Sequence, residues 1–373
     1  MIESASSRKP ERPPSEELPT GQSIPISHNP TSEQLFTPAF TPAQPGRMLR
    51  YTTQTSMKEI LGTLLPFFLF SFPDFAQTSR PSPTDTALKI VVLGSGGGPP
   101  ADTDRYGPSI LVEAGGQKLL FDCGRAAIIR LAQAGVGRQE IDKLFLTHLH
   151  SDHILSVPDI LLTGWTSGRK TPLRVWGPSG TKKMMENLLK AFDFDIHIRR
   201  DVDEKFSKEG IVVVPTEVQE GIVYEYNGLK VTAFLVDHGP VKPAFGYRVD
   251  AGSHSVVMSG DTRFSENLIK HATGVDVLIH EVSTLSVETL IARGSTREQA
   301  ENIINHHTSA ADTGTVFSRT KPRLAVYAHG GGPAAIEAAH KNYSGPIESA
   351  DDLTTILVGE KVEVRRASAR GTN

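Results

Sequence analysis

The chain has 373 residues, of which 38% are hydrophobic and 22% charged, and its formal net charge is −3. This composition is ordinary for a globular protein, and the charge balance excludes a strong global field for nucleic acid but not a local basic patch. A single cysteine, Cys123, excludes an intrachain disulfide and a cysteine-based metal site. Any metal ion must therefore be bound by nitrogen and oxygen, and 13 histidines can supply the nitrogen.

The first 86 residues precede the predicted fold. Residues 1–56 are interpreted as a disordered extension or the result of a start codon assigned too early, because residues 1–47 are rich in Pro, Ser, Thr and Gln without apolar periodicity. Residues 57–77 have the order of a signal peptide: a positive charge, an apolar run over 60–72 and a polar end. Residues 78–86 are a Ser/Pro/Thr linker.

The apolar run decides where the protein is expected to work. It is shorter than the roughly 20 residues that span a membrane. We therefore expect an exported protein, periplasmic or secreted, whose mature chain has no membrane span. The alternative is that the run forms a buried helix, in which case the protein is cytoplasmic.

From residue 88 onward, strand and helix patterns alternate, with hairpins in both halves. This order predicts an α/β fold over residues 87–366, with two sheets packed together and helices outside, followed by a disordered tail over 367–373. Strands are expected at 88–93, 109–113, 118–121, 143–146, 211–215, 222–226, 229–236, 245–249, 255–258, 275–279, 324–327 and 354–364, with 211–236 forming a meander. Helices are expected at 126–134, 159–164, 179–192, 265–272, 296–305, 309–318 and 333–341.

The strongest functional signal is Thr147-His148-Leu149-His150-Ser151-Asp152-His153, which follows a short buried strand. Alternate side chains at a strand end lie on one face, so His148 and His150 can bind one ion. The following turn can direct Asp152 and His153 toward a neighbouring ion. Four ligand-type side chains within six residues predict a metal site.

Further ligand candidates stand where later buried runs end in a polar residue, which is where active sites of layered folds lie. A carboxylate can bridge two cations, and Asp261, on a tight Gly-Asp turn, is the best candidate for that bridge. His307, at the start of a helix, could protonate the leaving group. His280 and His306 adjoin the predicted site. The ligand candidates at the ends of these later runs are His238, Asp261, Glu281 and His329.

In these motifs the chain resembles the metallo-β-lactamase superfamily, and within it the tRNase Z (ribonuclease Z) branch. The resemblance runs from about residue 88 to about residue 330. Its opening segments are Leu93-Gly94-Ser95-Gly96-Gly97 and Leu120-Phe121-Asp122-Cys123-Gly124, and its metal motif is 146–153. Its later segments are Ser259-Gly260-Asp261-Thr262, Ile279-His280-Glu281 and His307-Thr308-Ser309-Ala310.

The resemblance implies a four-layer αββα sandwich that holds two Zn²⁺ ions, and Mn²⁺ or Fe²⁺ would suit the same ligands. It assigns His148, His150 and His238 to one ion, and Asp152, His153 and His329 to the other. Asp261 would bridge the ions. A hydroxide between them would cleave a phosphodiester bond, as in RNA 3′-processing, with Asp152 orienting it, His307 protonating the leaving oxygen and Glu281 as a relay or orienting partner.

Two departures from the tRNase Z pattern keep a second function open. The tRNA-clamping arm that many members insert between the third-histidine motif and the bridging aspartate is absent between His238 and Asp261. Residues 169–209, with Lys182, Lys183, Arg199 and Arg200, could substitute, but their mixed charges favour an ordinary solvated surface. The export signal also argues against tRNA. The alternative is therefore an exported small-molecule ester hydrolase: an arylsulfatase, lactonase or β-lactamase.

Residues 158–165 resemble the arylsulfatase type of the superfamily as much as they resemble the tRNase Z type. Trp165 and Trp176 could line a substrate wall or belong to the core, and the core is preferred for Trp176. The partners expected are an RNA or small-ester substrate, and a homodimer is compatible with the sequence.

Overall fold

The structure is a computed structural model that describes residues 86–367. The predicted extension, signal peptide, linker up to residue 85 and tail from residue 368 lie outside the described residues. Within residues 86–367, no helix is both long and apolar enough to cross a membrane.

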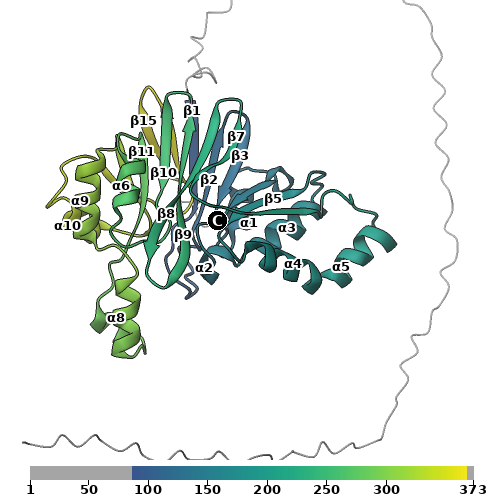
Figure 1. The fold of residues 1–373 in the computed structure, drawn as a ribbon, viewed down its shortest axis with the longest axis horizontal. Helices are drawn as coiled ribbons and strands as arrows, with labels where there is room; N and C mark the ends of the chain where they lie inside the picture. The colour runs from purple at the N-terminus through teal and green to yellow at the C-terminus, as the bar shows by residue number, and fades with distance from the viewer. Residues whose placement is uncertain (1–85, 368–373) are drawn as a thin grey trace, which may run out of the picture. The chain divides into compact units, whose positions relative to one another are not determined.

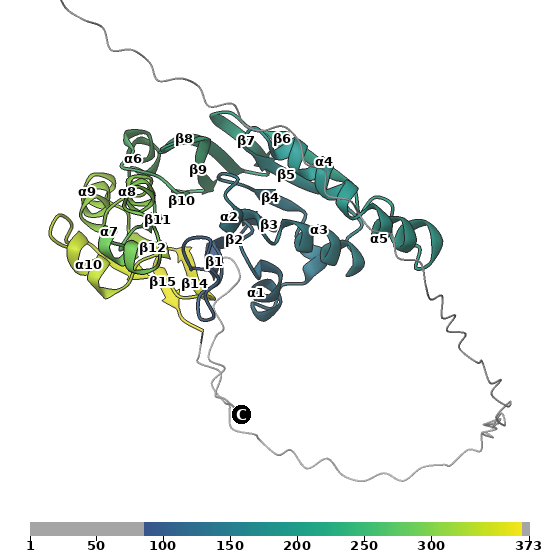
Figure 2. The same cartoon turned by 90° about the horizontal axis from the view of Figure 1, so that it is seen from below.

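Two β-sheets stack face to face at the centre of the described chain, as Figures 1 and 2 show. The first has eight strands in the order β15 (Val362–Arg365), β14 (Thr354–Gly359), β1 (Thr86–Gly94), β2 (Ser109–Ala114), β3 (Gln117–Phe121), β4 (Lys143–Phe145), β5 (Leu173–Gly177) and β6 (Val213–Glu217). The second has seven, in the order β13 (Ile347–Ser349), β12 (Leu324–Gly330), β11 (Val277–Val282), β10 (His254–Met258), β9 (Val241–Ala251), β8 (Leu229–His238) and β7 (Gly221–Tyr226).

Strand β1 shows how the sequence generates the layers. Successive side chains of a strand point to opposite faces of its sheet. Leu88, Ile90 and Val92 accordingly lie in the core between the sheets. Val91 and Leu93, from the same strand, pack into the helical layer outside the first sheet. A strand buried on both faces must be apolar at nearly every position, which is the pattern that predicted it.

Helices cover both outer faces, which confirms the expected αββα sandwich (Figure 2). Outside the first sheet are α1 (Ala127–Gln133), α2 (Ser151–Ile154), α3 (Val157–Thr166), α4 (Thr181–Ala191) and α5 (Asp193–His197). The second sheet is covered by α6 (Glu266–Ala272), α9 (Ala310–Thr320) and α10 (Pro333–Ala339). The pair α7 (Val287–Ala292) and α8 (Arg297–Asn305) extends from that side (Figure 1).

Both tryptophans belong to the core. Trp176 stacks on Phe145 between the sheets, with ring centroids 4.7 Å apart. Trp165 is buried outside the first sheet and donates its indole N–H to the carbonyl of Ser207 at 2.8 Å. The expectation for Trp176 is confirmed, and the suggestion that Trp165 lines a substrate wall is wrong because its side chain is enclosed.

Three details of the predicted elements were wrong. β6 pairs in parallel with β5 of the first sheet, so the meander contains β7, β8 and β9 but not the strand at 211–215. Residues 354–364 form the hairpin β14–β15 rather than one strand. Strand β5 was not predicted, because its five residues include the exposed Arg174 and show no clear alternation.

Candidate metal centre

The metal-type side chains begin where β4 ends. β4 lies between β3 and β5, so its carboxyl end is fixed at the edge of the first sheet. His148 follows it and is fully buried. His150 stands at the N-cap of α2, whose first turn carries the buried Asp152 and His153. His148 and His150 therefore stand at the strand end, and Asp152 and His153 stand in the turn that follows, as the sequence predicted.

Asp122 organises this segment, a role the sequence did not reveal. Its carboxylate accepts hydrogen bonds from the backbone N–H and hydroxyl of Thr147, both at 2.8 Å. It also lies 2.7 Å from Nδ1 of His153. Because a carboxylate only accepts, Nδ1 of His153 carries the proton and the lone pair of Nε2 points into the site.

The same tautomer is fixed at two other histidines. The Thr147 hydroxyl donates to Asp122, so it accepts from Nδ1 of His148 at 3.0 Å. Nδ1 of His238 donates to the carbonyl of His306 at 3.0 Å. Each ring therefore keeps the lone pair of its Nε2 for a ligand. Such outer partners orient metal-binding histidines in proteins generally.

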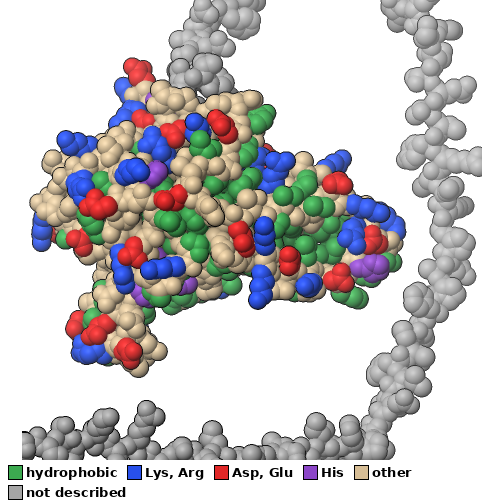
Figure 3. All heavy atoms as spheres, viewed as in Figure 1, with side chains coloured by type: hydrophobic (Ala, Val, Ile, Leu, Met, Phe, Trp, Pro, Cys, Tyr) green, Lys and Arg blue, Asp and Glu red, His purple; other side chains and the backbone are tan. Residues whose placement is uncertain are grey.

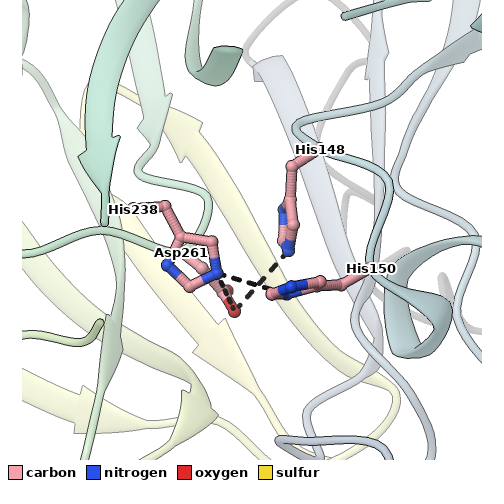
Figure 4. Close-up of side chains that lie close together, drawn as sticks. All are labelled: His148, His150, His238 and Asp261. Carbon is pink, nitrogen blue, oxygen red and sulfur yellow. Dashed lines mark hydrogen bonds and ion pairs between the residues drawn. The ribbon is translucent and has the colours of Figure 1, made fainter. Parts of the chain in front are cut away.

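The second sheet supplies the remaining groups from its own strand ends. His238 ends β8 and Asp261 follows β10, and Figure 4 shows both beside His148 and His150. His329 lies near the end of β12. Gly260 has φ 60°, and a Cβ there would lie 2.6 Å from the carbonyl oxygen of Phe245. Glycine is therefore required for the turn that aims Asp261 between the sheets.

These residues form two groups that meet at Asp261. One consists of His148, His150, His238 and Asp261, and the other of Asp152, His153 and His329; Asp261 and His329 also form a third, overlapping group with His307. In each group the candidate ligand atoms lie within 4.8 Å of one another. The Asp261 carboxylate lies between the groups, with Oδ1 3.3 Å from Nε2 of His153 and Oδ2 3.5 Å from Nε2 of His329. Its Oδ2 is also 3.9 Å from Nε2 of both His148 and His238.

The unpaired polar atoms of the site test whether it fits metal ions. Buried nitrogen and oxygen atoms almost always have a hydrogen-bond partner. Within the described residues, most of the buried side-chain atoms without a hydrogen bond lie here. Nε2 of His148, His153 and His329 and Oδ1 of Asp261 face one space, whereas Nδ1 of His307 and Oε2 of Glu281 face each other. Several lone pairs directed at one space are what a cation would satisfy, so the residues fit divalent ions.

The electrostatic environment of the site keeps a carboxylate ionised among the imidazole rings. Burial would raise the pKa of Asp261, but His329 and His153 hold it well below its ordinary value. Burial, together with the neighbouring His153, lowers the pKa of His148. Burial would also lower the pKa of His153, but Asp261 and Asp122 raise it well above its ordinary value, so a cation bound at Nε2 would replace the proton that these carboxylates favour there. An ionised carboxylate among imidazoles is the arrangement that divalent ions require.

Glu281 and His307 form a second unit beside the ligand groups. Oε1 of Glu281 accepts from the backbone N–H groups of Thr308 and Thr262 at 2.9 and 3.3 Å. Its Oε2 lies 3.3 Å from Nδ1 of His307. Burial would lower the pKa of His307, but Glu281 raises it to about 9. His307 is therefore protonated at neutral pH, and its Nδ1 lies 4.0 Å from Oδ2 of Asp261.

The two histidines expected near the site differ in their roles. His306 takes part through its carbonyl, which accepts from His238. His280 does not reach the site, because its side chain points to the opposite face of β11 from Glu281 and packs edge-on against Phe317. The sequence could not separate these faces, since every residue of β11 is buried.

No inserted arm separates the candidate ligands His238 and Asp261 in the second sheet. β9 and β10 form consecutive hairpins between His238 and Asp261, as the sequence indicated. The basic residues considered as a substitute are engaged: Arg199 pairs with Asp195 at 2.8 Å, and Arg200 with Asp201 at 2.6 Å. Around α5, Figure 3 shows blue and red side chains intermixed, which supports a solvated surface there.

Comparisons with known proteins identify relatives of this chain by sequence. A family model described as "Anti-Pycsar protein Apyc1" matches residues 88–292. Ribonuclease Z of Mycobacterium bovis (strain BCG / Pasteur 1173P2) is 35% identical over 284 residues, which cover 73% of this chain and 98% of that protein. Ribonuclease Z of Mycolicibacterium gilvum (strain PYR-GCK) is 36% identical over 245 residues, or 65% of this chain and 84% of that protein.

Solved structures share the fold. The metallo-β-lactamase fold protein YhfI from Bacillus subtilis is similar with a TM-score of 0.57 and 20% identity, over 73% of this chain and 99% of that one. The short form of human tRNase Z is similar with a TM-score of 0.54 and 19% identity, over 72% of this chain and 98% of that one. At these identities the likeness concerns the fold alone.

Proposed function

We propose that this chain, which belongs to the Anti-Pycsar Apyc1 family and to the ribonuclease Z-like branch of the metallo-β-lactamase superfamily, cleaves nucleotide phosphodiester bonds with two divalent ions. It is a metal-dependent hydrolase of phosphodiesters. The observation that carries the proposal is the convergence of unpaired buried atoms from both sheets on one space. Zinc is the ion we propose, because an imidazole-rich set without thiolates suits it well.

We assign the ions to the two groups that the structure brings together. His148, His150 and His238 would hold one, Asp152, His153 and His329 the other, and Asp261 would contact both. Two bound ions polarise a water molecule into a nucleophile near neutral pH and stabilise charge on the phosphoryl oxygens.

The chain's own residues supply the proton chemistry. Asp152 is buried and faces His329 at 3.6 Å, where its carboxylate can orient the attacking water. His307, kept protonated by Glu281, gives a proton to the leaving oxygen. Glu281 is held by two backbone N–H groups, so it fixes the ring of His307 in place.

RNA is the substrate class that the name of the relatives suggests. Ribonuclease Z of Mycobacterium bovis is matched over 98% of its length, and this match supports RNA as the proposed substrate class. The described residues have no long arm between His238 and Asp261 that could clamp a folded tRNA, so a short RNA with an accessible 3′ end is the RNA to test.

The test compares three substrates with zinc-loaded full-length protein: bis(nitrophenyl) phosphate, nitrophenyl sulfate and an RNA with a 3′ extension. His148→Ala is the blank. His197→Ala is the matched control, because His197 is an exposed histidine on α5. We expect turnover of the diester and the RNA that His148→Ala abolishes and His197→Ala retains. Turnover of the sulfate alone would contradict the proposal.

A second candidate is an exported hydrolase of small esters. It is favoured by the predicted signal peptide over 57–77 and by the short connection from His238 to Asp261. Fractionation of cells that express the full chain tests export: a product shortened near residue 77 outside the cytoplasm supports it. Recovery of the unshortened chain in the cytoplasm would leave RNA as the better substrate class.

A further inference from the structure

We propose that Arg125 binds a non-bridging oxygen of the substrate's phosphate from a pocket beside the candidate metal centre. This inference rests on the proposed function and names a residue that selects its substrate. The pocket is small, with a cavity volume of about 20 Å³. Its walls are the glycine-rich loop 96–102, which ends in Asp102, the segment 105–107, Arg125, Asp152 and Leu155. We call it the Arg125 pocket.

The Arg125 pocket adjoins the reacting centre through Asp152, which is both a candidate ligand and part of its wall. Arg125 follows the segment Asp122–Gly124, which orients the ligands of α2. A substrate that placed its phosphate at the ions would therefore have Arg125 on one side.

The charge of the Arg125 pocket suits an anion. Arg125 is exposed and makes no ion pair with any side chain of residues 86–367. Arg105 is held by oxygens that carry no formal charge: Nε donates to the Ser95 hydroxyl at 2.9 Å and Nη2 to the Ala350 carbonyl at 2.8 Å. The carboxylate of Asp102 accepts a hydrogen bond from the backbone N–H of Asp104 at 2.8 Å. Neither guanidinium makes an ion pair with a carboxylate of the described residues, although Asp102 and Asp152 also line the pocket.

The position of Arg125 is built into the backbone. A Cβ on Gly107 would lie 2.5 Å from the amide nitrogen of Arg125 and 3.0 Å from the carbonyl oxygen of Asp152. A Cβ on Gly124 would lie 2.5 Å from the same Asp152 oxygen. The main chain of Arg125 can approach that of Asp152 so closely because residues 107 and 124 are both glycines. The position of Arg125 relative to Asp152 is therefore fixed by the backbone.

The opposite wall is equally well fixed. Asp352 accepts from the backbone N–H groups of Ser95 and Tyr106, both at 2.9 Å, and from the Ser95 hydroxyl at 2.8 Å. It is also paired with Arg130 at 2.8 Å. These contacts connect the glycine-rich loop to the C-terminal part of the fold, so the pocket is preformed rather than shaped by its ligand.

Chemistry and size define what the pocket takes. A planar guanidinium recognises phosphate through paired N–H donors. The cavity of about 20 Å³ is far smaller than the roughly 300–1,000 Å³ of small-molecule pockets, so it has room for a phosphate oxygen but not for a nucleotide. We therefore expect Arg125 to bind a phosphate oxygen there, with the rest of the nucleotide outside the pocket.

Calorimetry with adenosine 5′-monophosphate and adenosine tests this on the zinc-loaded full chain. The variants are Arg125→Ala and Arg125→Lys. Arg174→Ala is the matched control, because Arg174 on β5 is exposed and makes no ion pair within the described residues. Arg125→Ala should weaken binding of the monophosphate roughly tenfold to a hundredfold, as for loss of a charge-assisted hydrogen bond. Arg125→Lys should restore part of it, and neither variant should change binding of adenosine.

Two results would overturn the inference: failure of the unaltered protein to bind the monophosphate, or equal binding by Arg125→Ala and the unaltered protein. In the diester assay, Arg125→Ala should raise KM more than it lowers kcat. If the protein binds the monophosphate through Arg125 but cleaves no diester, the proposed function fails and the anion site stands. If it cleaves diesters and Arg125→Ala changes nothing, only the inference fails.

Discussion

Removing the Asp122 carboxylate should weaken both the fold and the metal centre. Asp122→Ala leaves the Thr147 backbone N–H and Nδ1 of His153 without their shared acceptor. Each orphaned buried group costs about 1–3 kcal/mol, so the free energy of unfolding should fall by roughly 2–6 kcal/mol. Denaturant unfolding of the metal-free chain measures this loss.

Asp122→Asn separates stability from ligand orientation. The amide oxygen can still accept from Thr147, but the amide N–H₂ would face Nδ1 of His153, which then favours the opposite tautomer with the proton on Nε2. Partners of this kind contribute about 10–100-fold to metal affinity. We therefore expect metal affinity to fall by that factor in a chelator competition assay, with a smaller loss of stability than in Asp122→Ala.

The control is Asp276→Asn, which alters a partly buried carboxylate that binds Arg323 at 2.6 Å, outside the metal centre. It should lower stability and leave metal affinity unchanged. The reasoning is refuted if Asp122→Asn binds zinc as tightly as the unaltered protein, because His153 would then not depend on Asp122 for its orientation.

Three further predictions concern the proton donor, a buried arginine and acid stability. His307→Gln should lower kcat about 10²–10⁴-fold for RNA, and much less for a nitrophenyl diester, whose leaving group needs no proton; equal losses on both substrates would contradict its role as the acid. Arg169→Leu should destabilise the chain by roughly 3 kcal/mol in denaturant unfolding, because the buried guanidinium donates to the carbonyls of Ile141, Ile160, Leu161 and Gly210; Arg174→Leu should change little. Burial would raise the pKa of Asp276, but Arg323 and the Ser255 backbone N–H lower it below its ordinary value of 3.8. Its stabilisation is therefore present above pH 3.8 and lost as the pH falls through the lowered pKa, so melting temperatures of the unaltered protein and Asp276→Asn should converge in that acidic range; a constant difference would exclude this linkage.

The candidate ligands that the structure brings together were predictable because they share a local signature. His148, His238 and Asp261 each follow a buried apolar run, and a strand end is a place where polar side chains of different strands meet. The αββα layers followed similarly from alternating strands such as β1 and from hairpins in both halves. These properties depend on neighbours within a few residues, which the sequence displays.

The supporting contacts depend on distant residues and could not be predicted. Asp122 acts on Thr147 across 25 positions, and Asp352 acts on Ser95 across 257. Nothing near Arg125 in the sequence indicates that it shares a pocket with Asp152. The placement of β6 in the first sheet depends on its partner β5, which is too short to recognise by periodicity.

Anomalous diffraction from zinc-loaded crystals tests the central claim most directly. The account predicts two peaks about 3.5–4 Å apart, one contacted by His148, His150 and His238 and the other by Asp152, His153 and His329, with Asp261 touching both. In crystals of Asp261→Ala at least one peak should weaken. A single peak, or zinc bound elsewhere while these side chains remain free, would contradict the account.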